Sequence, residues 1–209
     1  MVAVTKRRTR QKPADRRDSI LEEAFGLIGQ HGFNGFTVQA LAARCDLSNA
    51  GILYHFGSKD GVLLALLDEL ERRDAVILSP LVEDAAQSRE TDRAHEALMV
   101  LLHAMAERCV SRPALDRFAL TLQSEAIDPT HPGHDWFRVR EQMMLDLFTR
   151  LLSSLVPEPE VTARHICALL IGLAQQWVRS GSAFDLVGQC DKAFETILRG
   201  ACEPSVQSN

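Results

Sequence analysis

Several patterns that identify membrane proteins, secreted proteins or common enzymes are missing from this sequence. No run of about 18 apolar residues is free of charge, so no segment is predicted to span a membrane. The basic N-terminus lacks the apolar core of a secretory signal. No Gly-rich phosphate loop follows a strand, and neither G-x-S-x-G nor H-E-x-x-H occurs. The sequence therefore predicts a cytoplasmic protein that is not an enzyme, with no catalytic residues and no cofactor.

Cysteine is scarce and shows no paired spacing. The chain has five cysteines, an odd number, and none lies in a C-x-x-C motif. Such a pattern is typical of reduced structural thiols. His55 has no second ligand at helical spacing, and the histidines of HPGH (131–134) are typical of a turn, so we predict no metal site. A metal or thiol sensor that uses the scattered histidines and cysteines, such as His165 with Cys167, stays open as an alternative.

Strand patterns are absent as well, because no alternation of apolar and polar residues lasts long enough. Proline, glycine and Asn/Asp clusters divide the chain into about nine predicted helices, which gives an all-α fold. Gly32 suits the left-handed position at the end of the first helix, and Ser79-Pro80 is predicted to end the fourth. The predicted helices span 14–30, 37–45, 48–56, 58–79, 89–110, 113–126, 134–155, 159–180 and 188–202.

Positive charge is concentrated at one end of the chain. Residues 1–17 hold seven basic residues and one acidic residue, a net charge of +6. The remaining residues hold 16 basic and 27 acidic side chains, a net charge of −11, so the total of −5 conceals an asymmetry. A basic arm on an acidic body is typical of a protein that contacts a polyanion, and equally of a solubilising tail. We predict a disordered basic arm over 1–13 and a disordered tail over 205–209.

The segment 38–56, VQALAARCDLSNAGILYHF, meets the requirements of two short helices joined by a tight turn. Ala42, Asp46 and Ile52 have the four- and six-residue offsets of a helix-turn-helix motif: a small residue at the crossing, a turn residue that tolerates left-handed backbone, and an apolar plug. The second helix, which starts at Ser48, would lie in the major groove of DNA. The residues expected to face inward are Leu41, Leu47, Ile52 and Leu53.

A set of short motifs from about Ile20 to Leu67 resembles the signature of the TetR family of bacterial transcription regulators. The motifs are Thr37, Leu41-Ala42, Leu47-Ser48, Gly51, Tyr54-His55-Phe56 and Ser58-Lys59-Asp60. The resemblance implies a three-helix DNA-binding domain, a larger helical domain that binds a small ligand, and a homodimer joined mainly by the last two helices. The corresponding domains are predicted at 14–57 and 58–204.

The resemblance also implies roles for individual residues. Thr37 and Lys59 would contact phosphates, and Ser48, Asn49 and Ala50 would face the bases. Asn can pair with adenine, whereas phosphate contacts fix the register without reading sequence. The predicted DNA-binding set is Thr37, Arg44, Ser48, Asn49, Ala50, Gly51, Tyr54, His55 and Lys59.

Two features depart from the commoner family pattern. Asp46 stands where the turn glycine is usual, which places a negative charge close to DNA. The usual glycine and tyrosine of the second helix each come one place later, at Gly51 and Tyr54. Which aromatic side chain touches the DNA backbone is therefore left open.

The helices after residue 88 offer candidates for a cavity and for a dimer interface. Met, aromatic and a few polar side chains suit an apolar cavity, although the same spacing is typical of plain core. The predicted ligand-binding set is His103, Met105, Phe118, Gln123, Met143, Phe148, Gln176 and Trp177. The helix at 159–180 is apolar all round and carries small residues four apart, so we predict dimerisation through it and the last helix; a plain buried core is the alternative. The predicted interface set is Ala168, Gly172, Gln175, Phe194, Ile197 and Leu198.

The sequence thus predicts a transcription repressor that a small-molecule effector releases from double-stranded DNA. A dimer would place its two reading helices about 34–36 Å apart, so a palindromic operator is expected. The fourth helix, 58–78, is the expected lever between the two domains. A DNA-binding regulator without any small ligand is the main alternative.

Overall fold

The computed structural model describes residues 13–88 and 90–202, and over these residues it contains nine α-helices and no strand. The predicted all-α fold is confirmed. Most of the predicted basic arm and the whole predicted tail lie outside the described residues. The helices are α1 (Pro13–Gly35), α2 (Val38–Arg44), α3 (Asn49–Phe56), α4 (Lys59–Gln87), α5 (Thr91–Ser111), α6 (Pro113–Glu125), α7 (His134–Leu152), α8 (Pro159–Arg179) and α9 (Leu186–Cys202).

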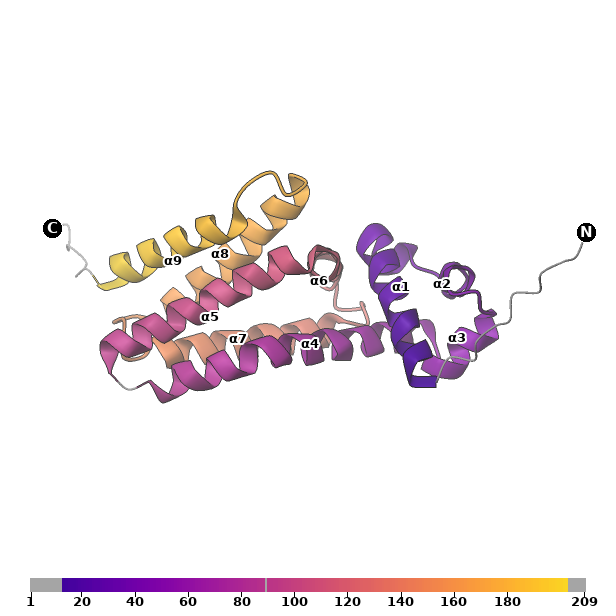
Figure 1. The fold of residues 1–209 in the computed structure, drawn as a ribbon, viewed down its shortest axis with the longest axis horizontal. Helices are drawn as coiled ribbons and strands as arrows, with labels where there is room; N and C mark the ends of the chain where they lie inside the picture. Colours follow the sequence, from indigo (N-terminus) through magenta and orange to yellow (C-terminus); the bar gives the residue numbers. More distant parts are fainter. Residues whose placement is uncertain (1–12, 89, 203–209) are drawn as a thin grey trace, which may run out of the picture.

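The helices form two parts that α4 connects (Figure 1). One end of the elongated molecule holds α1, α2 and α3, and the other holds a bundle of α5 to α9 packed along α4. None of the helices in the described part is long and apolar enough to cross a bilayer.

Two hydrophobic cores stabilise these parts, and α6 belongs to the first of them. That core combines residues of α1–α4 with Leu115, Phe118 and Leu122 of α6. The second core is built mainly by α5, α7, α8 and α9. The ring of Phe118 packs edge to face on Phe25 of α1, with 4.8 Å between centroids. A Cβ atom on Gly29 would lie 3.3 Å from the backbone nitrogen of Phe118, so α1 and α6 approach closely.

The first helix breaks at Gly32 but extends five residues beyond the predicted end at 30. Gly32 has φ 70°, ψ 172°, a conformation that glycine adopts readily. One further turn follows, because the Glu125 carboxylate of α6 accepts a 2.7 Å hydrogen bond from the backbone N–H of Phe33. A side chain at Gly32 would collide with that carboxylate, whose Oε1 lies 2.1 Å from the position of a Cβ atom. The break therefore joins α1 to the C-terminal end of α6.

The predicted end of the fourth helix at Ser79-Pro80 is wrong. Pro80 lies inside α4, which continues to Gln87. A proline in a helix interior costs about 3 kcal/mol, because it removes one backbone donor and crowds the preceding turn. Leu78, Leu81 and Val82 pack against the second core on either side of it, and this burial outweighs the local penalty. Smaller differences occur elsewhere: α7 ends at Leu152 rather than 155, and α9 begins at Leu186 rather than 188.

Candidate nucleic-acid interface and interior cavity

Three hydroxyl side chains cap the helices of the N-terminal part. Thr37 accepts a hydrogen bond from the backbone N–H of Ala40 (3.1 Å), and Ser48 accepts one from Gly51 (3.1 Å). Ser58 does the same for Gly61 at the start of α4 (2.9 Å). Such caps satisfy donors that a helix leaves free in its first turn. These residues are the first of three helices predicted at 37–45, 48–56 and 58–79, and their caps fix where α2, α3 and α4 begin.

The turn between α2 and α3 has the backbone that a helix-turn-helix motif requires. Asp46 has φ 52°, as predicted, so a non-glycine residue holds the left-handed position. The Leu47 N–H donates to the Ala42 carbonyl (2.9 Å), and the Arg16 guanidinium donates to the Cys45 carbonyl (2.9 Å). The turn is thus held by its own backbone and by α1.

The inner face of the motif is closed by apolar residues. Leu41 and Ile52 are fully buried, and Ala42 is nearly so. Leu53 was expected to face inward, and this is wrong: its side chain is 40% exposed. Ile52 is the buried residue of α3, and the next position turns toward solvent.

The outer face of α3 is polar at its start and aromatic at its end. Ser48, Asn49 and Ala50 are exposed, whereas Gly51 and His55 are half-buried. The side chain of Tyr54 is 87% exposed. Among the described residues, its one ring contact is an edge-to-face contact with His55, with 5.4 Å between the ring centroids. A large aromatic side chain so exposed contributes little to folding, and exposed aromatic groups of this kind are typical of binding surfaces.

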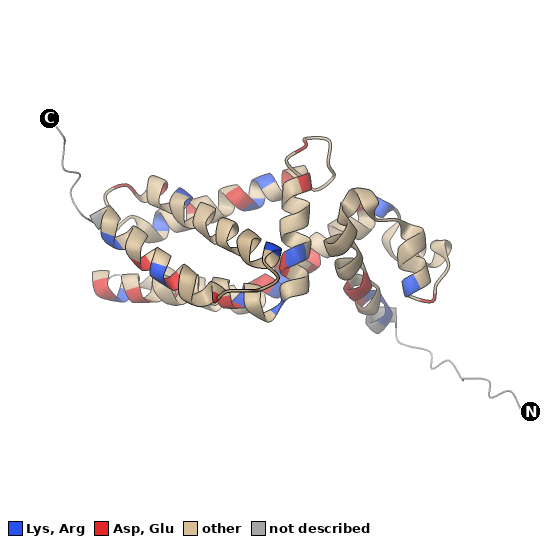
Figure 2. Ribbon diagram, turned by 90° about the horizontal axis from the view of Figure 1, so that it is seen from above, with Lys and Arg blue, Asp and Glu red and all other residues tan. Residues whose placement is uncertain are grey.

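The two basic candidates are each held by neighbouring side chains. The Lys59 ammonium lies 4.4 Å from the centroid of the Phe33 ring, a cation–π contact at the first turn of α4. Arg44, at the end of α2, forms an exposed ion pair with Glu23 at 3.4 Å. Figure 2 shows both basic and acidic segments on the end of the molecule that holds α1 to α3 and along the larger bundle. A DNA phosphate would have to compete with Glu23 for Arg44.

A partly open space of about 140 Å³ lies inside the bundle. It is bounded by α4, α5, α6, α7 and α8, and we call it the interior cavity. Met105, Gln123 and Phe148 line it, so three of the eight predicted ligand residues share this cavity. A second, open groove between α4 and α7 shares Asp74, Arg140 and Met144 with this cavity. The groove therefore reaches the cavity at those three side chains.

The other five predicted ligand residues do not line the interior cavity, and their grouping with it is corrected. Phe118 is fully buried against Phe25, and Trp177 is buried in the second core. Met143 is 60% exposed in the α4–α7 groove, and Gln176 is exposed. His103 joins α5 to α9 through a 2.9 Å contact with Asp191, which raises the pKa of the histidine.

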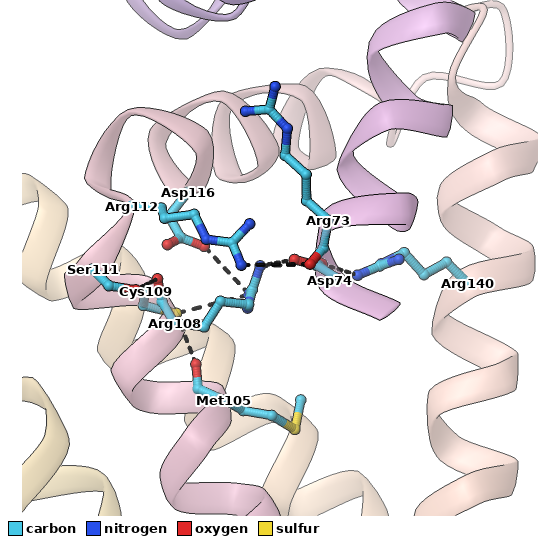
Figure 3. Close-up of polar contacts among 9 residues, drawn as sticks. All are labelled: Arg73, Asp74, Met105, Arg108, Cys109, Ser111, Arg112, Asp116 and Arg140. Carbon is cyan, nitrogen blue, oxygen red and sulfur yellow. Dashed lines mark hydrogen bonds and ion pairs between the residues drawn. The ribbon is translucent and has the colours of Figure 1, made fainter. Parts of the chain in front are cut away.

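Four charged side chains that the sequence did not single out form one wall of the cavity (Figure 3). Arg108 Nη1 donates to both oxygens of Asp74 at 3.0 and 3.1 Å, and its Nη2 lies 3.3 Å from Asp116 Oδ1. Arg140 donates to Asp74 at 2.7 Å. We call these four residues the buried charge network. It joins α4, α5, α6 and α7 beside the cavity.

The chemistry of the thiols bears on the sensor alternative. Burial raises the pKa of Cys109 to about 12, and those of Cys167 and Cys190 to about 11. These thiols are therefore protonated near neutral pH, whereas the thiolate is the form that reacts or binds a metal. Within residues 13–88 and 90–202, no three His, Cys, Asp or Glu side chains gather in a metal-binding arrangement. Nothing in the described part thus favours a metal or thiol sensor.

The predicted dimer residues divide between the surface and the core. Ala168 is exposed on α8, and Gly172 and Gln175 are half-exposed on the same helix. No atom lies within 4 Å of a Cβ placed on Gly172, so this face is open. Phe194 and Leu198 of α9 are buried in the second core of their own chain, which corrects their placement in an interface. Ile197 is half-buried and packs against that core.

Comparison with known proteins matches this architecture. Residues 20–66 match the family model described as "Bacterial regulatory proteins, tetR family". The chain is 38% identical over 68 residues to the HTH-type transcriptional repressor AcnR of Corynebacterium glutamicum, covering 32% of this chain and 36% of AcnR. It is 33% identical over 86 residues to the probable HTH-type transcriptional regulator YttP of Bacillus subtilis, covering 41% of this chain and 40% of YttP. The matched part thus spans well under half of these relatives' length.

Solved structures match over nearly the whole chain. The structure of NalD, a secondary repressor of a multidrug efflux pump in Pseudomonas aeruginosa, superposes with a TM-score of 0.72. This match has 18% sequence identity and covers 91% of this chain and 97% of NalD, so it concerns the fold. The helix-turn-helix geometry and the family model agree that residues 20–66 are similar to the DNA-binding part of the tetR family of bacterial regulatory proteins, and the solved structures show that the fold of the whole chain is similar to that of NalD.

Proposed function

We propose that this chain is a homodimeric transcription repressor that a small molecule releases from a palindromic operator. One observation carries the proposal: α3 is fixed by the fully buried Ile52, yet presents Ser48, Asn49 and a largely exposed Tyr54 to solvent. A helix anchored from behind, with short polar side chains at its N-terminus, suits the major groove. AcnR and NalD are both described as repressors, which supports repression rather than activation.

The exposed groups divide by the part of DNA they would contact. Asn49 would read a base edge, whereas Thr37, Lys59 and Tyr54 would contact the phosphate backbone. The Lys59 ammonium is also held by the aromatic ring of Phe33, so it would reach a phosphate from a fixed position. The boundary between the DNA-binding domain and the larger domain then falls at Gly57-Ser58.

Two helices would carry the effect of a ligand from the interior cavity to α3. The predicted lever, α4, contributes Asp74 to the cavity and Lys59 to the N-terminal part. The structure adds α6, which places Asp116 at the cavity and Glu125 on the backbone of Phe33. In the dimer, the two α3 helices would adopt one spacing that fits the operator and another that does not. A ligand can shift the equilibrium between these two states only by the difference between its affinities for them.

Operator recognition is testable without knowing the target genes. Selection from a randomised duplex library should return inverted half-sites centred about one helical turn, or a multiple of it, apart. Asn49→Ala should change the preferred bases, and Tyr54→Ala should weaken binding to all selected duplexes by roughly tenfold or more. Both variants should melt like the parent, because both side chains are exposed.

A matched control is Gln142→Ala, an exposed substitution on α7 that should leave DNA binding unchanged. If both α3 variants selected the same duplexes with the parent's affinity, α3 would not be the reading helix.

Dimerisation through α8 gives a second prediction. Gly172→Arg should convert the dimer to a 23.2 kDa monomer in light scattering and weaken operator binding, because a long cation would stand in the open face. The fold should survive, since nothing lies within 4 Å of the new Cβ atom. Gly26→Arg puts the same side chain on another open helical glycine, on α1, and should remain dimeric. A dimer that persists in Gly172→Arg would place the interface elsewhere.

A further inference from the structure

We propose that the interior cavity recognises a small uncharged molecule with an apolar ring and a hydroxyl-like head group, which donates to Asp116 and accepts from Arg108. This inference rests on the proposed function, for which the same cavity is the effector site. A phenol is the simplest member of this ligand class.

Two buried polar atoms of side chains that line the cavity have no hydrogen-bond partner in the part of the chain that the structure describes. They are Oδ2 of Asp116 and Nε of Arg108. Asp116 is only 4% exposed, and Figure 3 shows its carboxylate joined to Arg108 through one oxygen. The Cys109 thiol also interacts with this carboxylate. Buried polar groups are rarely left unpaired, because each forfeits its hydrogen bonds to water. One of the atoms is an acceptor and the other a donor, so a head group that does both would satisfy the pair.

The charge balance of the cavity disfavours ionic ligands. Two guanidinium groups, Arg108 and Arg140, face three carboxylates, Asp74, Asp116 and Glu141. An anion would therefore meet no uncompensated cation. An ammonium ion beside Asp116 would lie against the Arg108 guanidinium, 3.3 Å from the same carboxylate, and would offer Nε no acceptor. Burial also raises the pKa of Asp116, which weakens its hold on a cation.

The size and walls of the cavity suit a single ring. The space beside the buried charge network has a volume of about 140 Å³ and opens on the α4–α7 groove. This volume is close to the roughly 150 Å³ of an apolar cavity that holds benzene. Met105, Phe148 and Leu170 supply apolar surface from three helices, and methionine adapts to different shapes. A substituted six-membered ring would fill the space and place its head group on the buried charge network.

Calorimetric titration of the full-length protein with four one-ring probes tests the proposal. Phenol should bind roughly tenfold or more tightly than toluene, which fits the space but makes no hydrogen bond. Benzoate and benzylamine, which are charged near pH 7, should bind no better than toluene. Equal binding of phenol and toluene, tighter binding of either charged probe, or no binding of phenol would each overturn the proposal.

Two variants assign the recognition to Asp116. Asp116→Leu should lower the affinity for phenol to that for toluene, whereas Gln142→Ala, an exposed substitution on α7 that does not line the cavity, should keep the preference for phenol. If Asp116→Leu does not fold, Asp116→Asn should still weaken phenol binding several-fold, because a neutral amide is the weaker acceptor. Unchanged phenol affinity in the folded Asp116 variant would overturn the assignment.

The titration contains no DNA, so its outcome is separate from that of the duplex selection. A protein that selects an operator but ignores phenol would disprove this inference alone. A protein that binds phenol but selects no duplex would disprove the proposed function instead.

Discussion

Replacing Arg108 by methionine is expected to lower the free energy of unfolding by about 3–5 kcal/mol at pH 7. The substitution keeps much of the side-chain length but removes the cation that Asp74 and Asp116 share. Both carboxylates are only 4% exposed, so they would remain buried with far less compensation. Removing one partner of a buried ion pair is strongly destabilising, because the remaining charge cannot regain water. Equilibrium unfolding in urea measures the change.

The matched control is Arg72→Met on α4. Arg72 also pairs with a carboxylate, Glu69 at 2.7 Å, but its side chain is 66% exposed, so the loss of stability should be much smaller than for Arg108→Met. Adding Asp116→Asn to Arg108→Met should restore part of the stability, because it removes one of the uncompensated charges. If Arg108→Met were no more disruptive than Arg72→Met, the buried charge network would not hold the four helices together.

The N-terminal part was predictable because its rules are local. Thr37, Ser48 and Ser58 cap helices through hydrogen bonds to residues three places on, which sequence spacing alone specifies. The positive φ of Asp46 follows from the turn that the motif demands. Leu53 is the exception, because whether a helix buries one or two adjacent positions depends on how closely its neighbours approach.

The cavity was only partly predictable, because it depends on which face of each helix meets which other helix. Phe118 and Phe148 are both fully buried aromatic residues on helices, yet one packs on α1 and the other lines the cavity. Spacing within a helix does not distinguish these outcomes. Asp74 closes a polar stretch of α4 that suggests a solvated end, but Arg108 and Arg140 come to it from other helices. Only tertiary packing turns such charges into a buried charge network.

Pro80 shows the same limit of sequence-based prediction for the end of a helix. The rule that proline ends a helix is a local one, and at this site burial of Leu81 and Val82 in the second core overrides it. A local rule holds where nothing distant competes, as at the caps, and fails where a long helix gains packing along its whole length.

Gly61→Ala is expected to destabilise the protein by about 3 kcal/mol or more and to abolish operator binding. A Cβ atom at Gly61 would lie 1.9 Å from the backbone oxygen of Phe56, so α3 and α4 would have to separate. That movement would pull α3 off its supports, because the Ser58 cap and the last turn of α3 meet at this contact. Thermal unfolding and binding to selected duplexes measure the two effects.

Gly26→Ala, in a helix with open space around it, should instead raise stability by up to about 1 kcal/mol and keep DNA binding. A Gly61→Ala protein that melts and binds like the parent would mean that the α3–α4 junction can relax without cost, and that the position of α3 is not set by this contact.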